Sequence, residues 1–381
     1  MRSRDFLIFF SVVFIIYAAA NTFLFIKGMV AFNNIIGEGL YAIIFIILAL
    51  TFLAGKILER RSSSVLIDIL NITGGFWLSF MLYSVLLIIL ADISRGILLA
   101  FDIIESGNAE IVRKSSYMLA FMISLVLIII GFSNTIFTAI RTYKIEIPKT
   151  VSLKELRIAA VSDIHLGSVI RRRSMKILSE KLKKISPDII LFLGDIVDGE
   201  INPVLRDDLL EALILPESAK HVYAITGNHE YIGGFTKAVD YIESKGIRVL
   251  IDEAIEPEDG ILLIGRKDRD AKRYTGEDRK KVEELLENID SRKAIICLDH
   301  QPPFRNGKTE KGFDLVLSGH THNGQMWPLN YLTSKIYKIK YGHALIDGCN
   351  YIVSSGFGSW GPRVRLGSRS EVLDIIVSFK N

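Results

Sequence analysis

Two hydropathy patterns divide the chain near residue 150. Before that point, long apolar stretches are separated by short polar segments, whereas after it short apolar runs alternate with longer amphipathic stretches. Four windows of the first part contain no Asp, Glu, Lys or Arg: residues 6–26, 39–55, 69–91 and 115–140. A helix needs about 20 apolar residues to cross the hydrocarbon core of a bilayer. The pattern therefore predicts an all-α transmembrane region of four helices over residues 1–150.

Lysines and arginines beside these windows predict the orientation of the transmembrane region. With the N-terminus in the cytoplasm, the inner flanks carry eight of these residues and the outer loops carry four. Cytoplasmic loops are enriched in Lys and Arg, so this orientation is favoured, and it leaves the rest of the chain in the cytoplasm. The first window also resembles a cleaved signal peptide, which would leave three spans and the same final side. We favour an uncleaved helix because apolar residues continue through Phe25.

Residues 151–381 have the pattern of a globular α/β domain. Short apolar runs predict strands at residues 157–161, 189–193, 221–225, 261–264, 294–298, 315–317 and 351–353. Amphipathic stretches predict helices at residues 173–184, 203–212, 235–245 and 278–289. This alternation is typical of folds with a largely buried sheet, in which ligands bind at the carboxyl ends of the strands.

Composition narrows the classes of function. The first 150 residues carry 12 Lys and Arg against 9 Asp and Glu, and the remainder carries 34 against 33. The charge balance of the second part gives no reason to expect nucleic acid as a partner. Cys297 and Cys349 are too few to form a disulfide framework. Because the four apolar windows hold no ionisable residue, the sequence favours a membrane anchor over a transporter.

Polar residues follow five of the predicted strands. In chain order they are Asp163-Ile-His165, Gly194-Asp195-Ile-Val-Asp198, Gly227-Asn228-His229-Glu230, His300 and Gly319-His320-Thr-His322. Each group alone is weak evidence, but all five lie where strand ends meet at one edge of a sheet. Imidazole and carboxylate ligands together suit Mn, Fe, Zn or Co, and two such ions about 3.5–4 Å apart can clamp a displacement at phosphorus. The glycines before Asp195, Asn228 and His320 predict sharp backbone turns.

These motifs resemble those of the calcineurin-like metallophosphoesterase superfamily over residues 156–378. Residues 319–328 and 356–367 are similar to the membrane-anchored branch, in which transmembrane helices precede the phosphoesterase domain. The resemblance implies a four-layer α/β/β/α sandwich for residues 151–381. It also implies a hydrolase that acts on phosphoester bonds, with two divalent metal ions per chain and a metal-bridging hydroxide as nucleophile.

The resemblance further implies a role for each matching residue. It assigns Asp163, His165 and His322 to the first metal, Asn228, His300 and His320 to the second, and Asp195 to both. His229 would protonate the leaving oxygen. Asp198 and Glu230 would support the ligands, Asp299 would be a turn residue, and Arg365 would support the site or contact substrate. Arginines at 171–173, 266–273 and 363–369 suit phosphate, although a solvated face or attraction to anionic lipid explains them equally well.

The expected substrate is a phosphodiester or pyrophosphate near the membrane. A multi-span anchor concentrates lipid-linked phosphoesters beside the site, and UDP-2,3-diacylglucosamine is one example. Alternatives are a phosphoprotein phosphatase and a non-catalytic metal-dependent sensor or scaffold that signals through the helices. A scaffold has no need of an acid such as His229, so the sequence favours an enzyme.

Overall fold

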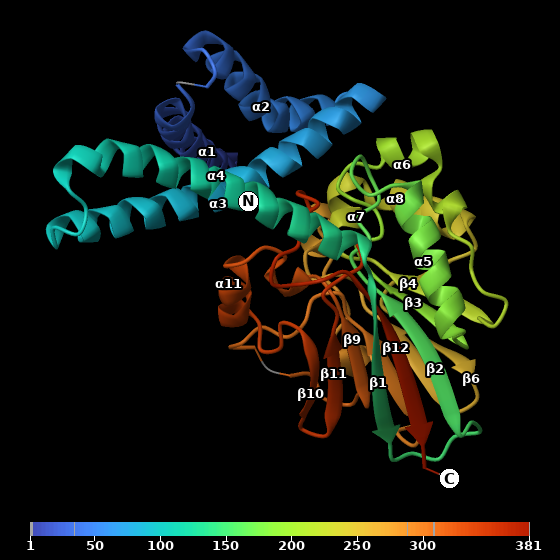
Figure 1. Cartoon of the computed structure of the whole chain (residues 1–381). Helices are drawn as coiled ribbons and strands as arrows, with labels where there is room; N and C mark the ends of the chain where they lie inside the picture. The colour runs from blue at the N-terminus through green and yellow to red at the C-terminus, as the bar shows by residue number, and fades with distance from the viewer. Residues whose placement is uncertain (1–2, 34, 288, 308, 381) are drawn as a thin grey trace. The chain divides into compact units, whose positions relative to one another are not determined.

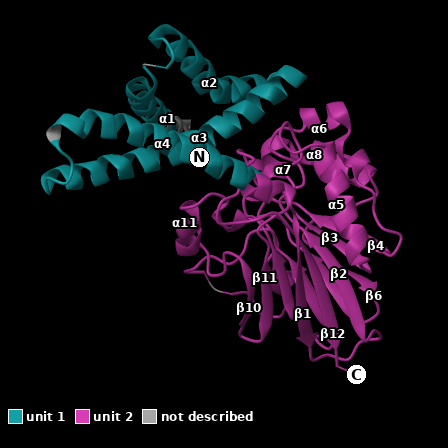
Figure 2. Ribbon diagram, in the orientation of Figure 1, with its two compact units in different colours: residues 1–132 teal, residues 133–381 magenta. Residues whose placement is uncertain are grey.

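The computed structural model describes residues 3–380 except 34, 288 and 308. Its contacts divide the chain into two compact units, Met1–Phe132 and Ser133–Asn381 (Figure 2). The hydropathy pattern changes near residue 150, whereas residues 133–150 group with the second unit. Residues 133–150 belong to the second unit because they contain its strand β1 (Ala139–Ile147).

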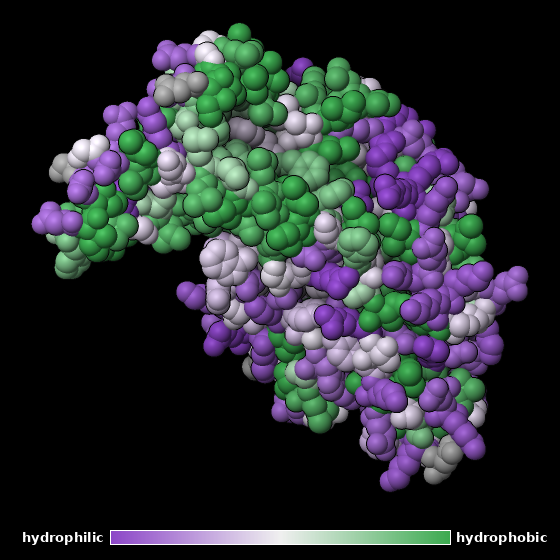
Figure 3. Space-filling model, in the orientation of Figure 1, coloured by the Kyte–Doolittle hydropathy of each residue, from purple (hydrophilic) through white to green (hydrophobic). Residues whose placement is uncertain are grey.

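Four long helices make up most of the first unit (Figure 1). They are α1 (Ser3–Phe32), α2 (Glu38–Glu59), α3 (Val65–Ala100) and α4 (Ala109–Ile136), with a short 3-10 turn at Ser106–Asn108. Each helix is long and apolar enough to cross a membrane. Figure 3 shows hydrophobic residues over the surface of these helices, where many Ile, Leu and Val side chains are exposed. An exposed apolar surface of this extent is typical of a membrane-spanning region.

The helices extend beyond the charge-free windows, and one group of their charged residues joins three helices. Lys27 of α1 donates a hydrogen bond of 2.7 Å to Asp92 of α3. Tyr117 of α4 donates one of 2.6 Å to the same carboxylate. Charged groups among apolar helices are costly unless they are paired, so this cluster joins three helices of the unit.

Two six-stranded sheets form the second unit. The first has the order β1 (Ala139–Ile147), β12 (Glu371–Phe379), β2 (Glu155–Val161), β3 (Ile189–Leu193), β4 (His221–Ile225) and β5 (Arg248–Leu250). The second has the order β10 (Gly342–Ile346), β11 (Cys349–Val353), β9 (Leu315–Ser318), β8 (Ala294–Leu298), β7 (Ile261–Gly265) and β6 (Glu253–Glu258). Strands β2 to β5 are parallel, as are β7, β8, β9 and β11, so their carboxyl ends lie together at one edge of each sheet.

Helices lie outside both sheets. They are α5 (Arg172–Ile185), α6 (Asn202–Asp207), α7 (Asn228–Gly233), α8 (Phe235–Ser244), α9 (Ala271–Thr275), α10 (Val282–Leu285) and α11 (Leu329–Ile336), with 3-10 turns at Leu209–Ala212 and His322–Gly324. One apolar core, including Leu191 and Ile296, fills the space between the sheets. A second core joins α5 and α8 to the first sheet, and a third covers the outer face of the second sheet. The domain is therefore the α/β/β/α sandwich that the sequence predicted.

Three predicted elements are wrong in extent. The helix predicted at 203–212 is broken at Asp208 (φ 42°), which separates α6 from the 3-10 turn at Leu209–Ala212. The apolar window 115–140 is not one helix, because α4 ends at Ile136 and Ala139 begins β1. The helix predicted at 278–289 is helical only over Val282–Leu285 among its described residues. Ahead of that turn, the backbone N–H of Lys280 donates to Asp252 at 2.8 Å. Such a bond competes with the helical pattern and delays the start of the helix.

Candidate metal centre

All seven metal ligands that the sequence analysis assigned lie at the carboxyl edge of the two sheets. Asp163 and His165 follow β2, Asp195 follows β3, Asn228 begins α7 after β4, His300 follows β8, and His320 and His322 follow β9. Interior strands of two different sheets supply them, so the site forms only when both sheets pack together. Most of these side chains are buried, which removes competing water from the ligand atoms.

The first group of ligands consists of Asp163, His165 and His322. The Nε2 atoms of the two histidines lie 3.1 Å apart. His322 Nε2 is 3.5 Å from Asp163 Oδ1. Two nitrogens bound to one cation at about 2.0–2.1 Å, at roughly right-angled to tetrahedral positions, lie about 3 Å apart. The spacing of this group therefore suits a shared cation.

The second group contains Asp195, His300, His320 and Asn228. Asp195 Oδ2 lies 3.1 Å from His300 Nε2. His320 Nδ1 lies 3.0 Å from Asn228 Oδ1. The same Asp195 oxygen is also 3.8 Å from Nε2 of His165, which belongs to the first group. Asp195 thus lies between the two groups, in the position of a bridging carboxylate.

Unpaired buried nitrogens support the fit of a cation. His300 donates from Nδ1 to the carbonyl of Leu193 at 2.7 Å, which leaves a lone pair on Nε2. Among the described residues, His300 Nε2 is buried without a hydrogen-bond partner. A buried polar atom without a partner is costly, and a bound metal ion satisfies it. The residues present therefore fit a pair of divalent cations.

Backbone conformation sets this edge apart from the rest of the domain. Five ligand residues have positive φ: Asp163 (53°), His165 (53°), Asp195 (51°), His320 (69°) and His322 (48°). Non-glycine residues rarely adopt this left-handed conformation, and clusters of them are typical of functional sites. The surrounding fold must stabilise these conformations, because each one is unfavourable on its own.

The glycines before the ligands act in two ways. Gly194 has a φ of 86°, which agrees with the expected sharp turn before Asp195. Gly227 and Gly319 are required for space instead, because a Cβ on Gly227 would lie 2.2 Å from Asp195 Oδ1. A Cβ on Gly319 would lie 2.4 Å from Asp163 Oδ2. These two glycines let neighbouring loops approach the carboxylates closely.

Glu230 supports the backbone of the site. Its carboxylate is buried and accepts hydrogen bonds from the N–H groups of Asp195 (3.0 Å), Val197 (3.0 Å) and Gly227 (2.7 Å). Burial, together with the charge of Asp195, raises the pKa of Glu230 to about 7. Glu230 therefore connects the loop after β3 to the loop after β4 and is placed to orient the bridging carboxylate.

His229 and Asp198 form an ion pair beside the ligands. His229 Nδ1 lies 2.9 Å from Asp198 Oδ1, which is also 3.6 Å from His165 Nδ1. Burial on its own would lower the pKa of His229, but the charges of Asp195 and Asp198 outweigh it and raise the pKa to about 9. His229 is therefore protonated at neutral pH. Its ring centroid lies 6.4 Å from that of the exposed Trp360.

Arg365 is fully buried and contacts a metal ligand. Its Nη2 donates to His322 Nδ1 at 2.9 Å, and its other nitrogens donate to the carbonyls of Ser355 and Gly358 and to Ser368 Oγ. Of the two expected roles, support of the site agrees with this position, and contact with substrate from the surface does not. Local sequence patterns do not indicate this partner, because His322 lies 43 residues earlier in the chain.

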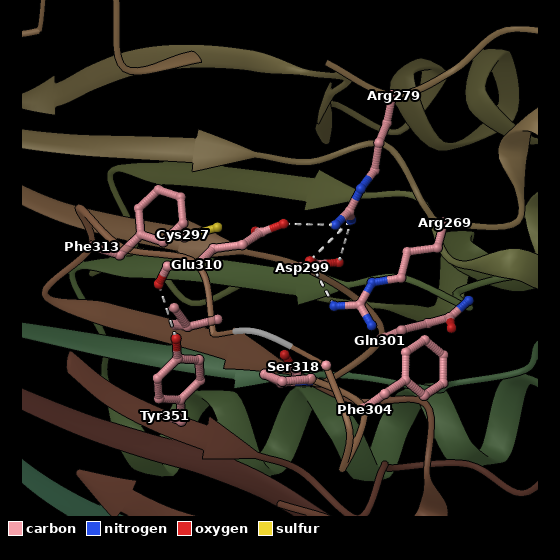
Figure 4. A pocket seen from close by; sticks show the side chains of 13 residues that line it. Arg269, Arg279, Cys297, Asp299, Gln301, Phe304, Glu310, Phe313, Ser318 and Tyr351 are labelled. Atoms are coloured by element: carbon pink, nitrogen blue, oxygen red, sulfur yellow. Dashed lines mark hydrogen bonds and ion pairs between the residues drawn. The ribbon is translucent and has the colours of Figure 1, made fainter. Parts of the chain in front are cut away.

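Arg266 and Arg269, two of the three arginines at 266–273, belong to an internal ion network, whereas Arg273 is exposed. Arg279 and Arg269 extend toward Asp299, at 3.0 and 3.3 Å (Figure 4). Buried Arg266 pairs with Glu310 and approaches Asp299 at 3.9 Å. These side chains border a cavity of about 200 Å³ on the outer face of the second sheet. Asp299 is therefore the centre of a buried network, and its description as a turn residue is wrong.

The remaining histidines lie away from the ligands. His221 is at the amino end of β4, opposite the metal-ligand edge, and is 3.9 Å from Glu258. His343 is exposed on β10 and bonds Asn350 at 2.9 Å. The sequence analysis missed Gln325, which donates to the carbonyl of Trp360 at 3.0 Å and accepts from its N–H at 3.0 Å. This pairing holds Trp360 near His229, and its only sequence signal is the similarity of residues 319–328 to the membrane-anchored branch.

Comparisons with known proteins agree with this site. A family model described as calcineurin-like phosphoesterase matches residues 156–324. An uncharacterized metallophosphoesterase of Aquifex aeolicus is 33% identical over 249 residues, which cover 65% of this chain and 94% of the relative. One from Campylobacter jejuni is 28% identical over 381 residues and covers 97% of both chains.

A vertebrate relative also carries the transmembrane description. The bovine transmembrane protein with metallophosphoesterase domain is 30% identical over 290 residues, which cover 71% of this chain and 65% of the bovine protein. Among solved structures, a dimetal phosphatase from Danio rerio matches 59% of this chain and 99% of its own, with 12% identity and a TM-score of 0.34.

Proposed function

The chain belongs to the calcineurin-like metallophosphoesterase family, and from that premise we propose that it cleaves a phosphodiester or pyrophosphate bond at the membrane. Membership makes it a phosphoester hydrolase of a dimetal family, and its four apolar helices make it a membrane protein. We further propose the type of bond, the role of each site residue and the side of the membrane on which the site lies.

The position of Asp195 carries the proposal. One of its oxygens faces His300 at 3.1 Å and His165 at 3.8 Å, and these histidines belong to different ligand groups. Two cations held a few ångströms apart repel one another, so a carboxylate between them is required to bring them together. The other oxygen of Asp195 accepts a hydrogen bond of 2.8 Å from the N–H of His229, which fixes the carboxylate in place.

The donor set suits Mn, Fe, Zn or Co as the resident ions. When bound, two such ions would supply Lewis acidity toward the phosphoryl oxygens and a nucleophile derived from water. Asp163, His165 and His322 would hold one ion, and His300, His320 and Asn228 would hold the other, with Asp195 shared. The buried position of these groups excludes bulk water from the reaction.

His229 is proposed as the acid that donates a proton to the leaving oxygen. Its pKa of about 9 keeps it protonated at neutral pH, and Asp198 holds its ring through Nδ1. The proton available for transfer is therefore the one on Nε2. A non-catalytic scaffold would have no use for a protonated histidine in this position, so this pairing favours an enzyme.

A lipid-linked substrate on the cytoplasmic side is the finer part of the proposal. Four membrane spans keep the site close to lipids, and Lys and Arg counts beside the spans favour a cytoplasmic catalytic domain. UDP-2,3-diacylglucosamine, a nucleotide-linked lipid pyrophosphate, represents this class.

The test is hydrolysis of bis(p-nitrophenyl) phosphate by the full chain in detergent, first stripped of metal and then supplied with Mn. Asp195→Asn should abolish turnover, whereas Asp290→Asn, which changes an exposed aspartate, should not. Turnover that needs metal and Asp195 supports the two-metal proposal. Two bound ions without turnover on any phosphoester would favour a sensor, and preference for phosphopeptides over diesters would favour a protein phosphatase.

A further inference from the structure

Helix α11 (Leu329–Ile336) turns its apolar side away from the protein. Leu329, Tyr331, Leu332 and Ile336 are exposed, with 57% of Leu332 and 61% of Tyr331 accessible. The polar residues at 330, 333 and 334 are the half-buried ones. A surface helix normally buries its apolar side and exposes its polar side. The inverted pattern indicates that an apolar environment covers α11.

The last turn of α4 lies in the same unit as α11 and is bonded to the metal-site loop. Asn134 of that turn donates to the carbonyl of Arg365 at 3.0 Å, and its own carbonyl accepts from Ser370 at 3.2 Å. The next carbonyl along, that of Leu366, accepts from the N–H of Trp327 at 2.6 Å. Two adjacent carbonyls therefore connect the end of α4 to Trp327, which directly precedes α11 and is 49% exposed.

This end of α4 coincides with the end of a membrane span. The charge-free part of the helix, residues 115–136, is about 33 Å long at 1.5 Å per residue, close to the hydrocarbon thickness of about 30 Å. Only Phe137 and Thr138 separate it from β1. Strand β1 is parallel to β12, which is antiparallel to β2. The start of β1 is therefore at the same edge as the carboxyl end of β2, where the metal ligands lie.

From these observations we propose that Trp327 and the exposed face of α11 form an interfacial surface that lies in the headgroup layer of the membrane. The surface comprises Trp327, Leu329, Tyr331, Leu332 and Ile336. Trp and Tyr are the residues that membrane proteins place at this depth. Residues 315–346 contain no Asp or Glu, while Lys335 and Lys338 are exposed beside the apolar face. That charge pattern complements anionic headgroups.

The interfacial surface brings the metal centre to the lipid headgroups. Gln325 holds Trp360 through two hydrogen bonds, and Trp360 lies 6.4 Å from His229, ring centroid to ring centroid. A phosphoester in the headgroup layer would reach the metal ligands without leaving the bilayer. The surface itself does not depend on the proposed reaction, since its location is measurable without turnover.

A depth measurement tests the location. Tyr331→Cys carries an environment-sensitive fluorophore in the full chain, reconstituted in nanodiscs that contain lipid with a headgroup-level nitroxide quencher. Native Cys297 and Cys349 are buried, so labelling of the unsubstituted protein gives the background. Thr150→Cys is the matched control, because Thr150 is exposed just beyond the end of β1. The nine residues of β1 span about 30 Å from the metal-ligand edge to that end. We expect strong quenching at 331 and none at 150.

Equal quenching at both positions would overturn the proposal. So would a blue-shifted but unquenched fluorophore at 331, because a protein surface, such as a second copy of the chain, would then cover α11. In a second experiment, Leu332→Glu should lower turnover of a lipid phosphoester in the same nanodiscs about tenfold, the loss expected for one apolar anchor. Hydrolysis of soluble bis(p-nitrophenyl) phosphate should not change, and Thr150→Glu should alter neither rate.

These readouts separate the two proposals. If no variant and no wild-type protein hydrolyses any phosphoester, the proposed function is wrong, and quenching at 331 still decides the location of the surface. If soluble hydrolysis is normal and Leu332→Glu cleaves the lipid substrate at the wild-type rate, the interfacial surface is wrong and the proposed function stands.

Discussion

Arg365 Nη2 donates a hydrogen bond of 2.9 Å to Nδ1 of His322, on the side of the ring opposite the other ligands. A guanidinium has only donors, so Nδ1 of His322 is the acceptor in this contact. Metal-bound histidines usually donate from their second nitrogen to a carbonyl or carboxylate. Here the second partner is a donor whose remaining N–H groups are all held by the loop of residues 355–368. A neutral His322 in this contact carries its proton on Nε2 and would release that proton when Nε2 takes a cation, and the positive charge of Arg365 favours the release.

Replacing Arg365 should weaken metal binding at the first group of ligands. Arg365→Lys removes the planar fork that orients His322, and loss of an orienting partner typically lowers metal affinity about 10–100-fold. Metal content after dialysis should fall from two tightly bound ions per chain toward one. Arg363→Lys is the control, since Arg363 on the same loop donates to Ser174. Wild-type metal content in Arg365→Lys would show that His322 needs no such support.

The role of His229 as an acid predicts a dependence on the leaving group. His229→Ala should slow hydrolysis of an alkyl phosphodiester, whose leaving oxygen needs a proton, by about 10²–10⁴-fold. Hydrolysis of bis(p-nitrophenyl) phosphate should fall much less, because p-nitrophenolate leaves without protonation. Rates on the two substrates, with metal content as a control for intact ligands, give the comparison. An equal loss on both would assign His229 to binding or to structure.

Asp198 should set the basic limb of the pH–rate profile. The charges of Asp195 and Asp198 raise the pKa of His229 to about 9, and bound cations would neutralise much of the effect of Asp195. Asp198→Asn removes the negative charge that contacts the ring directly, so the pKa of His229 should fall and its proton should be lost at lower pH. The basic limb of kcat/KM for the alkyl diester should therefore move to lower pH. An unchanged limb would mean that another group titrates there.

The clustering of the candidate ligands could be predicted from sequence because each of these residues follows a strongly apolar run. Strand ends are local features, and parallel strands bring their carboxyl ends to one edge without any further information. The predicted strands at 189–193, 221–225 and 294–298 coincide with β3, β4 and β8. Local pattern and global arrangement therefore agree where the chemistry lies.

Long-range partners could not be predicted in this way. Strand β1 continues the apolar window of α4, so hydropathy alone merges the two, and its partner β12 is more than 200 residues away. Arg266 is fully buried, yet its sequence context of seven charged residues in 266–273 resembles an exposed face. Only the tertiary position of Asp299 and Glu310 explains it. A hydropathy pattern carries no information on which charges pair across such distances.

Gly319 should tolerate no side chain. In Gly319→Ala the new Cβ would lie 2.4 Å from Asp163 Oδ2 and 2.5 Å from Ser162 Cβ, so the Asp163 carboxylate must move away from His322. Metal content and turnover should both drop to background while the fold persists by circular dichroism. Gly307→Ala is the control, because its Cβ meets nothing closer than 3.3 Å. Normal metal binding by Gly319→Ala would show that the loops after β2 and β9 can separate freely.

Asp299 should contribute stability through its buried arginines. Burial alone would raise its pKa, but the charges of Arg279, Arg269 and Arg266 outweigh it and hold the pKa below the usual value. Asp299→Asn leaves Arg266 and Arg279 with Glu310 and removes the carboxylate that faces Arg269, and loss of one partner in a buried ion pair typically costs about 3–5 kcal/mol. In a domain of this size, that cost corresponds to a fall in Tm of roughly 10 °C at neutral pH.

Acid should remove the stabilisation that the Asp299 carboxylate provides, so the effect of Asp299→Asn on Tm should depend on pH. A carboxyl whose pKa is lowered in the folded state stabilises the protein above its unfolded pKa and loses that effect as pH falls through the folded value. The difference in Tm between wild type and Asp299→Asn should therefore be largest at neutral pH and shrink toward pH 3. Asp290→Asn, which removes a carboxylate whose partner Arg292 is exposed, should change Tm much less at every pH, because solvent screens a surface pair. A pH-independent difference for Asp299→Asn would attribute its effect to packing and not to charge.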